Sequence, residues 1–468
     1  MAASVSPSET VETVREEVIG WRRYLHQHPE RSFHEERTSQ WIADTLAGFG
    51  GLEITRPTPT SVLARLKGAR PGRVLAIRAD IDALPIEERN THSFVSENPG
   101  TMHACGHDGH TAMLLGAVKV LIGRRDSLAG EVRFIFQHAE ELHPGGAEEL
   151  VEAGVMDGVD VVIGAHLWLP LEVGKVGVKA GKLMAAPDIV RITITGSGGH
   201  AALPHQTVDP IAVSAQVITN LQHIVARNVD PLEPSVISIT RIAGGTTHNV
   251  IPGSVEMEGT VRTFDESLRV EMPRLIERII AGITSAHGAS YTLSYERGYR
   301  PVVNDERASD LLRRAVVRAL GEEALTEAIP CMGGEDFSAY QQRAPGAFFF
   351  VGARCEERGI VQPHHHERFD IDERALDYGR ARSSSLHWTF SPRHTDEAVP
   401  LARRDSDTRD ARWRSIRQPC TAIRVGPSVP TRVDRCVGCD HVSRDGDHLF
   451  SGQQARRRDS QCDRCFLR

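Results

Sequence analysis

The sequence predicts an α/β protein that carries a second, smaller α+β unit. Through roughly the first 184 residues, short apolar runs alternate with segments of helical spacing, which is typical of a largely parallel sheet. Between about 185 and 297 the order becomes strand, helix, two strands, helix and strand, the ferredoxin-like pattern. The α/β rhythm then resumes, so we expect the smaller unit to be inserted into the larger one.

The expected elements follow from apolar periodicity, taken along the chain. In the α/β part we expect helices at 10–28, 111–122, 147–153 and 308–320, and strands at 74–77, 132–136, 161–164 and 347–352. In the inserted part we expect strands at 189–195, 235–242, 255–262 and 291–296, and helices at 208–227 and 266–287. The first helix ends at His28 because Pro29 follows, and the residue before a proline avoids helical geometry.

Four segments are therefore expected, and the last of them has a different composition. Residues 1–184 and 298–380 are the two parts of the α/β domain, residues 185–297 the insertion, and residues 381–468 a tail. The tail has seventeen arginines and no lysine, and no apolar periodicity, which favours disorder or a shifted reading frame. The alternative is a four-cysteine zinc ribbon, because the tail contains two Cys-x-x-Cys pairs, at 436–439 and 462–465.

Charge and hydropathy limit the classes of partner. A net charge of −7 over 468 residues argues against nucleic acid or an anionic membrane as a partner and favours a small polar substrate. No apolar run approaches the roughly 18 residues that a membrane span requires, and the first residues do not resemble a signal peptide. A cytoplasmic location is expected. The three cysteines before the tail, at 105, 331 and 355, are too few for a disulfide framework.

Ligand-type side chains follow several of the predicted strands. Cys105 and His107 share one tight loop, and a thiolate and an imidazole are good zinc ligands, although a buried cysteine and a capping aspartate would explain the loop equally well. Because ligands gather at the carboxyl ends of strands in open α/β sheets, we expect six side chains to converge, those of Asp80, Cys105, His107, Glu140, Glu141 and His166. An isolated Glu-Glu pair would more often be solvated. His103, Asp108 and His110 are expected to support the site.

A further ligand is expected from the run His364-His365-His366, but composition does not choose among the three. Gly196 to Ala201 fits G-x-G-x-x-A, yet Leu203-Pro204 follows in place of a helix, which argues against a dinucleotide site. The usual motifs of serine hydrolases, zincins and P-loop proteins do not occur. These patterns favour a metal site.

The motifs together resemble the M20 metallopeptidase family, and within it the amidohydrolase branch of hippurate hydrolases, N-acyl-amino-acid deacylases and auxin-conjugate hydrolases. The resemblance runs from about residue 12 to about 380, on the segments RADIDALPI (78–86), GTMHACGHDGH (100–110), QHAEE (137–141), VDVVIGAHLW (159–168), GSGGHAALPHQTVDP (196–210), HNVIP (248–252), GTVRTF (259–264) and GGEDFS (333–338). It implies a zinc-peptidase-like catalytic domain interrupted by a lid domain that also mediates homodimerisation.

The resemblance also implies the metal site. Two divalent metal ions per chain, of manganese, zinc, cobalt or nickel, would be held by Cys105, His107, Glu141, His166 and His365. Matching Phe369-Asp370 to the end of the family's late motif selects His365. The thiolate of Cys105 would bridge the ions, and Asp80 would orient the site from behind.

The activity implied is hydrolysis of the amide bond of a small N-acyl amino acid. Glu140 would take a proton from a metal-held water and return it to the leaving amine, while His200 of the partner subunit would stabilise the oxyanion. Asn249 would lie near the substrate, and Arg262 would pair with its carboxylate. The alternatives are an M20-type dipeptidase or aminoacylase and, more remotely, a non-catalytic binding protein or a regulator acting through a zinc ribbon.

Overall fold

The structure is a computed structural model that describes residues 7–377. The predicted tail at 381–468 and its zinc-ribbon alternative lie outside the described residues. Within residues 7–377, no helix combines the length and the apolar character that crossing a membrane requires.

An eight-stranded sheet forms the centre of the α/β part. Its order is β1-β2-β4-β3-β5-β16-β6-β15, with the bounds β1 Glu53–Thr55, β2 Val62–Lys67, β3 Arg70–Asp80, β4 Ala129–Gln137, β5 Val161–Glu172, β6 Val176–Val178, β15 Leu325–Glu327 and β16 Gly346–Arg354. The four central strands β4, β3, β5 and β16 run parallel, whereas β1, β2 and β4 pair antiparallel, as do β16 and β6. The expected mostly parallel α/β sheet is confirmed.

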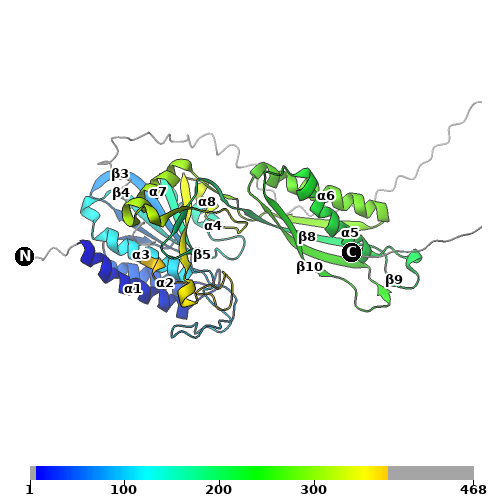
Figure 1. Ribbon diagram of the computed structural model, residues 1–468, viewed down its shortest axis with the longest axis horizontal. Coiled ribbons are helices and arrows are strands. Elements are labelled where there is room, and N and C mark those ends of the chain that lie inside the picture. The colour runs from blue at the N-terminus through cyan, green and yellow to red at the C-terminus, as the bar shows by residue number, and fades with distance from the viewer. Residues whose placement is uncertain (1–6, 378–468) are drawn as a thin grey trace, which may run out of the picture. The chain divides into compact units, whose positions relative to one another are not determined.

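Helices cover both faces of this sheet. Helices α1 (Pro7–Gln27), α2 (Glu36–Phe49) and α3 (His107–Ile122) lie together beside it (Figure 1), and their buried side chains share one apolar core with α7 (Glu306–Leu320). The shorter helices α4 (Ala147–Glu152) and α8 (Ser338–Gln341) contribute to a second core, which includes Phe348 and Phe350 of β16. Because both faces are covered, β4 and β16 are buried along almost their whole length.

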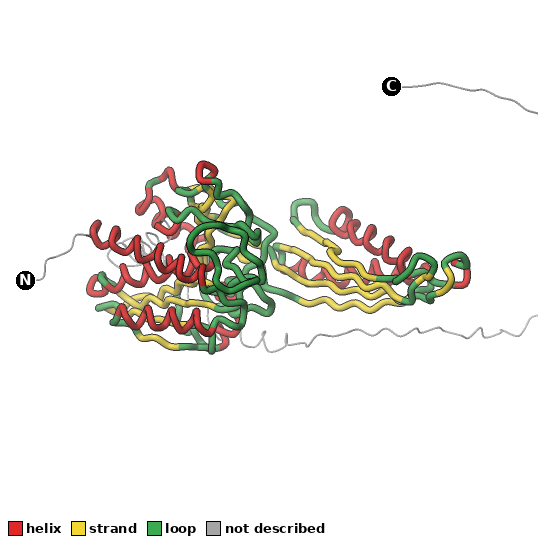
Figure 2. Tube along the Cα trace, turned by 90° about the horizontal axis from the view of Figure 1, so that it is seen from below, coloured by secondary structure: helices red, strands yellow, loops and turns green. Residues whose placement is uncertain are grey.

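Residues 186–296 form a four-stranded antiparallel sheet of their own. Its order is β10-β12-β8-β13, and its bounds are β8 Ala186–Thr195, β10 Ser235–Ala243, β12 Ser254–Thr263 and β13 Ser290–Glu296. Helices α5 (Pro210–His223) and α6 (Glu266–His287) lie on one face of it (Figure 2), against inward residues such as Val190 and Ile192. The predicted strand and helix order is present, and the division of the chain at 185 and 297 stays a prediction.

The predicted helix at 208–227 is present, but its last residues are not α-helical. Pro210 begins α5, and the carboxylate of Asp209 caps it by accepting hydrogen bonds from the backbone N–H groups of Ile211 and Ala212. The α-helix ends at His223, and a π-helical turn follows directly over Ile224–Asn228. Two small sheets complete the described strands, β7 (Gly181–Met184) with β14 (Val302–Asn304) and β9 (Gly199–His200) with β11 (Val250–Ile251).

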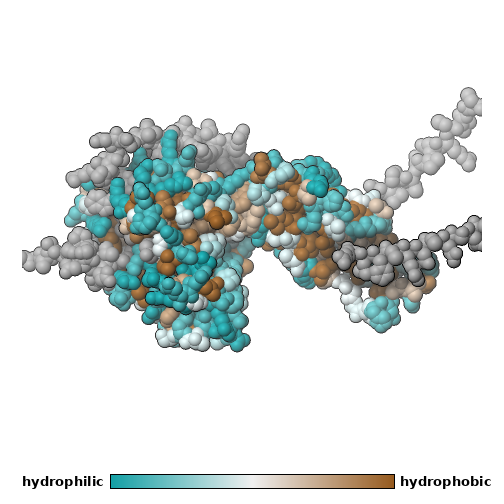
Figure 3. Space-filling view, in the orientation of Figure 1, coloured by the Kyte–Doolittle hydropathy of each residue, from teal (hydrophilic) through white to brown (hydrophobic). Residues whose placement is uncertain are grey.

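Apolar side chains are exposed on the segment that includes the four-stranded sheet. Figure 3 shows apolar surface over this segment, and among the described residues the exposed large apolar side chains within it are Leu203, Ile211, Leu232, Ile242, Val250 and Val270. Singly exposed apolar residues are ordinary on protein surfaces, whereas several on neighbouring elements are typical of an interaction surface.

Candidate metal centre

All five predicted metal ligands lie in one cluster with Glu140. The Sγ atom of Cys105 lies 3.4 Å from Nε2 of His166. The Nε2 atom of His365 lies 3.2 Å from Oε1 of Glu141, and Nε2 of His107 lies 3.8 Å from the same oxygen. Three overlapping sets have their ligand atoms within 4.8 Å of one another: Cys105, His107 and His166; Cys105, Glu141 and His365; His107, Glu140 and Glu141.

The carboxyl ends of parallel strands bring these side chains together. Gly106, with a φ of 98°, makes the turn between Cys105 and His107, and α3 begins at His107, four residues earlier than expected. Glu140 and Glu141 follow β4, and His166 lies within β5. The last ligand comes from the loop after β16, where the backbone N–H of His365 donates to the carbonyl of Ala104 over 2.8 Å.

Hydrogen bonds to Nδ1 leave Nε2 of His107 and of His166 directed at the cluster. The Nδ1 atom of His107 lies 3.0 Å from the carbonyl oxygen of Asp82 and 3.1 Å from its Oδ1. Both are acceptors, so Nδ1 carries a proton, and in the neutral form of the ring that binds a metal the lone pair is on Nε2, which is buried without a hydrogen-bond partner. In the same way, Nδ1 of His166 donates to the carbonyl of Leu167 over 2.7 Å. Oε1 of Glu141 is also buried without a hydrogen bond. These unsatisfied acceptors fit a cation.

The electrostatics of the cluster favour a cation as well. Burial, with the carboxylates of Glu141 and Glu140, raises the pKa of the Cys105 thiol well above its ordinary value. Burial and nearby Glu335 and Glu141 do the same to the pKa of Glu140. Burial alone would lower the pKa of His107, but the neighbouring carboxylates raise it to about 10. The surroundings of the cluster therefore favour added positive charge, and its sulfur, nitrogen and oxygen donors suit a divalent transition metal.

Asp80 lies behind the cluster in a buried ion-pair network. Its Oδ1 accepts from Nδ1 of His110 and its Oδ2 from Arg78, each over 2.6 Å. Oδ2 is also 3.8 Å from Nε2 of His107. Burial would raise the pKa of Asp80, but His107, Arg78 and His110 together hold it well below its ordinary value. Asp80 therefore stays ionised. The residue that orients His107 by accepting its hydrogen bond is Asp82 and not Asp80.

The sequence interpretation missed the residues that shape the turn before Glu140. Ala139 has a positive φ of 50°, which is uncommon for a residue with a side chain, and its N–H donates to Oε1 of Glu35 over 2.8 Å. The hydroxyl of Tyr299 donates to the carbonyl of Glu140 over 2.8 Å. Glu35 precedes α2 and Tyr299 follows β13. Nothing in the local sequence pattern connects either residue with Glu140.

Three predicted site residues lie apart from this cluster. His200 is exposed on β9, and Val250 on β11 pairs with it, next to the exposed Asn249. Arg262 lies on β12 and donates from Nε to the carbonyl of Met332 over 3.1 Å. Within residues 7–377, no hydrogen bond or ion pair joins His200, Asn249 or Arg262 to the cluster.

The supporting residues divide into two groups. His110 contacts Asp80 and accepts a hydrogen bond at Nε2 from the N–H of Leu167 over 2.8 Å, and its supporting role stays a prediction. Asp108 does not cap α3, whose N-terminal residue has no side-chain cap. Its carboxylate instead binds Arg22 and His26.

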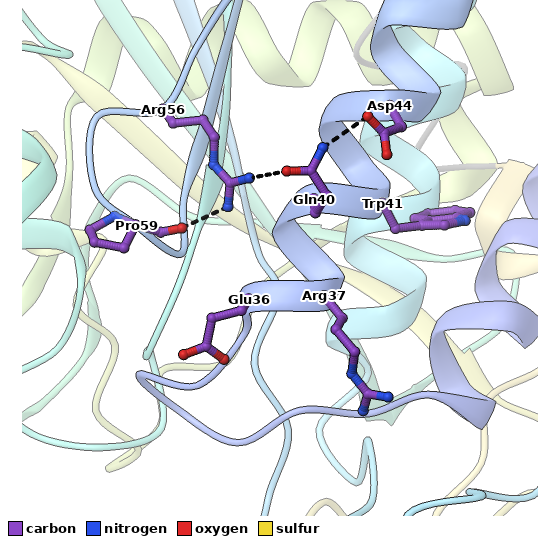
Figure 4. Close-up of a pocket in the computed structure, with 7 residues that line it drawn as sticks. All are labelled: Glu36, Arg37, Gln40, Trp41, Asp44, Arg56 and Pro59. Carbon is purple, nitrogen blue, oxygen red and sulfur yellow. Dashed lines mark hydrogen bonds between the residues drawn. The ribbon is translucent and has the colours of Figure 1, made fainter.

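A surface pocket elsewhere in the α/β part does not belong to this site. It has a volume of about 610 Å³ and is lined by residues of α2 and of the loop before β2 (Figure 4). Arg56 binds Gln40 over 2.7 Å and the carbonyl of Pro59 over 2.6 Å, and Gln40 binds Asp44 over 2.9 Å. These groups bind one another, which leaves little polar capacity for a ligand.

Comparison with known proteins identifies the family. The model of peptidase family M20/M25/M40 matches residues 76–382. The chain belongs to this family. It is 65% identical over 294 residues, 63% of this chain and 80% of the relative, to an N-acyl-L-amino acid amidohydrolase of Geobacillus stearothermophilus. It is 43% identical over 363 residues, 77% of this chain and 93% of the relative, to an N-acetylcysteine deacetylase of Bacillus subtilis.

A solved structure of the M20 family supports the same conclusion. A dinuclear metal-binding peptidase of Bacillus subtilis is similar with a TM-score of 0.71 and 40% identity, covering 80% of this chain and 98% of the other. The resemblance to the amidohydrolase branch of the M20 family is thus confirmed, and with it the α/β fold and the assignment as a metal-dependent hydrolase of the M20 type.

Proposed function

We propose that this M20-family chain hydrolyses the amide bond of N-acyl amino acids such as hippurate or N-acetyl amino acids. The observation that carries the proposal is that five ligand-type side chains and a buried carboxylate, Glu140, lie together beside the central parallel strands. The similarity to an N-acyl-L-amino acid amidohydrolase and an N-acetylcysteine deacetylase supports the substrate class. The expected cytoplasmic location stays a prediction.

The proposed ligands of two divalent ions are Cys105, His107, Glu141, His166 and His365, with manganese, zinc, cobalt and nickel as the candidate metals. When bound, such ions supply Lewis-acid activation of water and of the amide carbonyl. Cys105 is central to this arrangement, because it shares one ligand set with His107 and His166 and another with Glu141 and His365. This position supports its proposed bridging role.

Glu140 is the proposed general base. Its raised pKa makes it a good proton acceptor, which can take a proton from the attacking water and return it to the leaving amine. The Tyr299 hydroxyl and the Glu35 carboxylate hold the backbone on either side of its Cα, so that the carboxylate is presented in a fixed direction. Asp80 orients this region through Arg78 and His110.

We further propose that residues 185–297 form a lid and dimerisation domain whose His200 acts in the partner's active site. The N–H of Ala202 donates to Nδ1 of His200 over 3.0 Å, so the proton of a neutral imidazole is on Nε2. His200 is exposed, and Leu203 and Val250 beside it are 42% and 48% exposed. An exposed N–H donor beside apolar surface suits a group that stabilises the oxyanion in another subunit.

Asn249 and Arg262 are the proposed substrate-binding residues. Asn249 precedes β11, whose Val250 pairs with His200, and its carbonyl accepts from the N–H of Ala201 over 3.1 Å, so Asn249 adjoins the small sheet that carries His200. Arg262 is partly buried, and its contact with Met332 brings it to the segment that precedes Glu335 and Asp336. A guanidinium there would bind the carboxylate of an amino-acid product.

Substitution of the proposed base tests the reaction. Glu140→Gln should retain the metal content of the wild type and lose hydrolysis of hippurate and N-acetyl amino acids. Glu148→Gln, an exposed neighbour on α4, is the matched control and should keep full activity. Full activity in Glu140→Gln would contradict the assignment.

The same assay separates the alternatives. Dipeptides are included in the substrate panel, and faster hydrolysis of them than of hippurate and N-acetyl amino acids would favour the M20-type dipeptidase or aminoacylase alternative. Each of the four candidate metals is added in turn. A chain ending at about residue 380 should keep its metals, whereas loss of all metal would favour the tail as the binding site.

A further inference from the structure

A second cluster of ligand-type side chains lies outside the proposed metal centre. It combines His26, near the end of α1, with Glu88 and His92 from the segment between β3 and α3. Oε1 of Glu88 lies 3.1 Å from Nε2 of His26 and 3.4 Å from Nε2 of His92. The ligand atoms all lie within 4.8 Å of one another. A metal with bonds of about 2.0–2.2 Å requires similar separations between its ligands.

Other groups hold two of these side chains from behind. Nδ1 of His26 lies 2.8 Å from a carboxylate oxygen of Asp108, so Nδ1 donates and Nε2 faces Glu88. The second oxygen of Glu88 accepts from the N–H of Ser96 over 2.7 Å, while Asn90 donates to the first oxygen over 3.0 Å. Histidines that bind metals are commonly oriented by a carboxylate in this manner.

The ring nitrogens of His92 make no hydrogen bond, and Nε2 lies 3.4 Å from Oε1 of Glu88. The ring stacks on Phe94 with centroids 3.8 Å apart, and both nitrogens are buried without a hydrogen bond. Its side chain is 18% exposed. Buried polar groups are almost always paired, and a cation between Nε2 and Glu88 would pair this one.

The charges around the cluster leave room for a cation. Arg22 and Arg23 pair with three carboxylates, those of Asp108, Asp370 and Glu373, whereas the carboxylate of Glu88 contacts only histidines among the ion pairs of the described residues. A proton on His26 would satisfy the contact with Glu88, but it would leave His92 unpaired and part of the negative charge uncompensated. A divalent cation accounts for both observations.

We propose that His26, Glu88 and His92 bind an additional divalent transition-metal ion, separate from those expected at the Cys105 cluster. Two imidazoles and one carboxylate are typical ligands of zinc and its neighbours. The ion would connect the end of α1 to the segment that leads to Cys105, and it takes no part in the hydrolytic reaction.

Metal stoichiometry tests the proposal. Full-length protein is stripped with a chelator, reloaded with zinc chloride and passed through a desalting column, and its zinc content is measured. His92→Leu should bind one zinc fewer per chain than the wild type, while His205→Leu, an exposed histidine, should bind as many as the wild type. Equal zinc content in His92→Leu and the wild type overturns the proposal.

Cobalt spectroscopy gives a second, independent measurement. In Cys105→Ser, cobalt at the proposed site should still give visible d–d bands without a thiolate charge-transfer band, and adding His92→Leu should reduce those bands. Unchanged bands in the double variant overturn the proposal. If circular dichroism shows that His92→Leu is unfolded, Glu88→Gln replaces it in both experiments. Retained amide hydrolysis by His92→Leu distinguishes this site from the proposed active site.

Discussion

Asp82 contacts His107 twice, through its carbonyl oxygen at 3.0 Å and its Oδ1 at 3.1 Å from Nδ1. The other carboxylate oxygen, Oδ2, accepts from the N–H of Glu141 over 3.0 Å, so one side chain orients two proposed ligands. Asp82→Ala should therefore weaken metal binding by about 10–100-fold. Competition with a chelator measures this affinity. Asp160→Ala, which affects a carboxylate that binds the N–H of Val74, is the control and should leave the affinity unchanged.

Two inactive variants should restore activity when mixed. Glu140→Gln lacks the proposed base, and His200→Ala lacks the donor proposed to act in the partner's site. A hybrid dimer contains one site with both groups, so random exchange should recover about a quarter of wild-type activity. The hydrolysis rate of the mixture after subunit exchange provides the measurement. No recovery, with hybrid dimers demonstrated, would show that His200 does not act across subunits.

Stability should fall as the pH rises through the titration of Glu35. Burial and the nearby carboxylate of Asp82 raise the pKa of Glu35 from 4.5 to about 8. The folded state therefore favours the protonated form. This contribution is complete below pH 4.5 and is lost as the pH rises through about 8.

The free energy of unfolding, measured with urea at several pH values, tests this effect. The free energy of unfolding of the wild type, taken relative to that of Glu35→Gln, should decrease between pH 5 and 8. The expected slope is up to about 1.4 kcal/mol per pH unit. A chelator is present throughout, because metal binding adds its own pH dependence. Glu36→Gln, an exposed neighbour, should follow the wild type. Parallel curves for the wild type and Glu35→Gln would contradict the expectation.

The three consecutive histidines should differ in their effects. His365→Ala should lower metal affinity, since His365 contacts Glu141. His364 packs against Trp168 with ring centroids 4.9 Å apart, and its Nε2 accepts from the N–H of Leu169, so His364→Ala should mainly lower the melting temperature. His366→Ala is the control. Metal titration and thermal unfolding of the three variants separate the effects, and equal affinity in all three would exclude His365 as a ligand.

Much of the fold and the cluster could be predicted because both depend on local patterns. Apolar runs mark β4 and β5, and the side chains at their carboxyl ends converge because the strands are parallel. Strand direction is not encoded locally, so the antiparallel pairing of β2 with β4 was not predicted. Glu35 was missed because it contacts Ala139, 104 positions away, through the backbone. Asp82 was missed because it lies two positions after Asp80. Strand alternation places both side chains on the same side, so the sequence pattern does not distinguish them.

The proposed ligands also have a consequence for assembly of the chain. Cys105 and His365 share one ligand set but are 260 positions apart in sequence, and the loop of His365 follows β16, the last strand of the described chain. A metal held by both would act as a cross-link that closes most of the chain into a loop, and such a closure restricts the unfolded ensemble. The ion needed for hydrolysis would then bind fully only after β16 has packed beside β5.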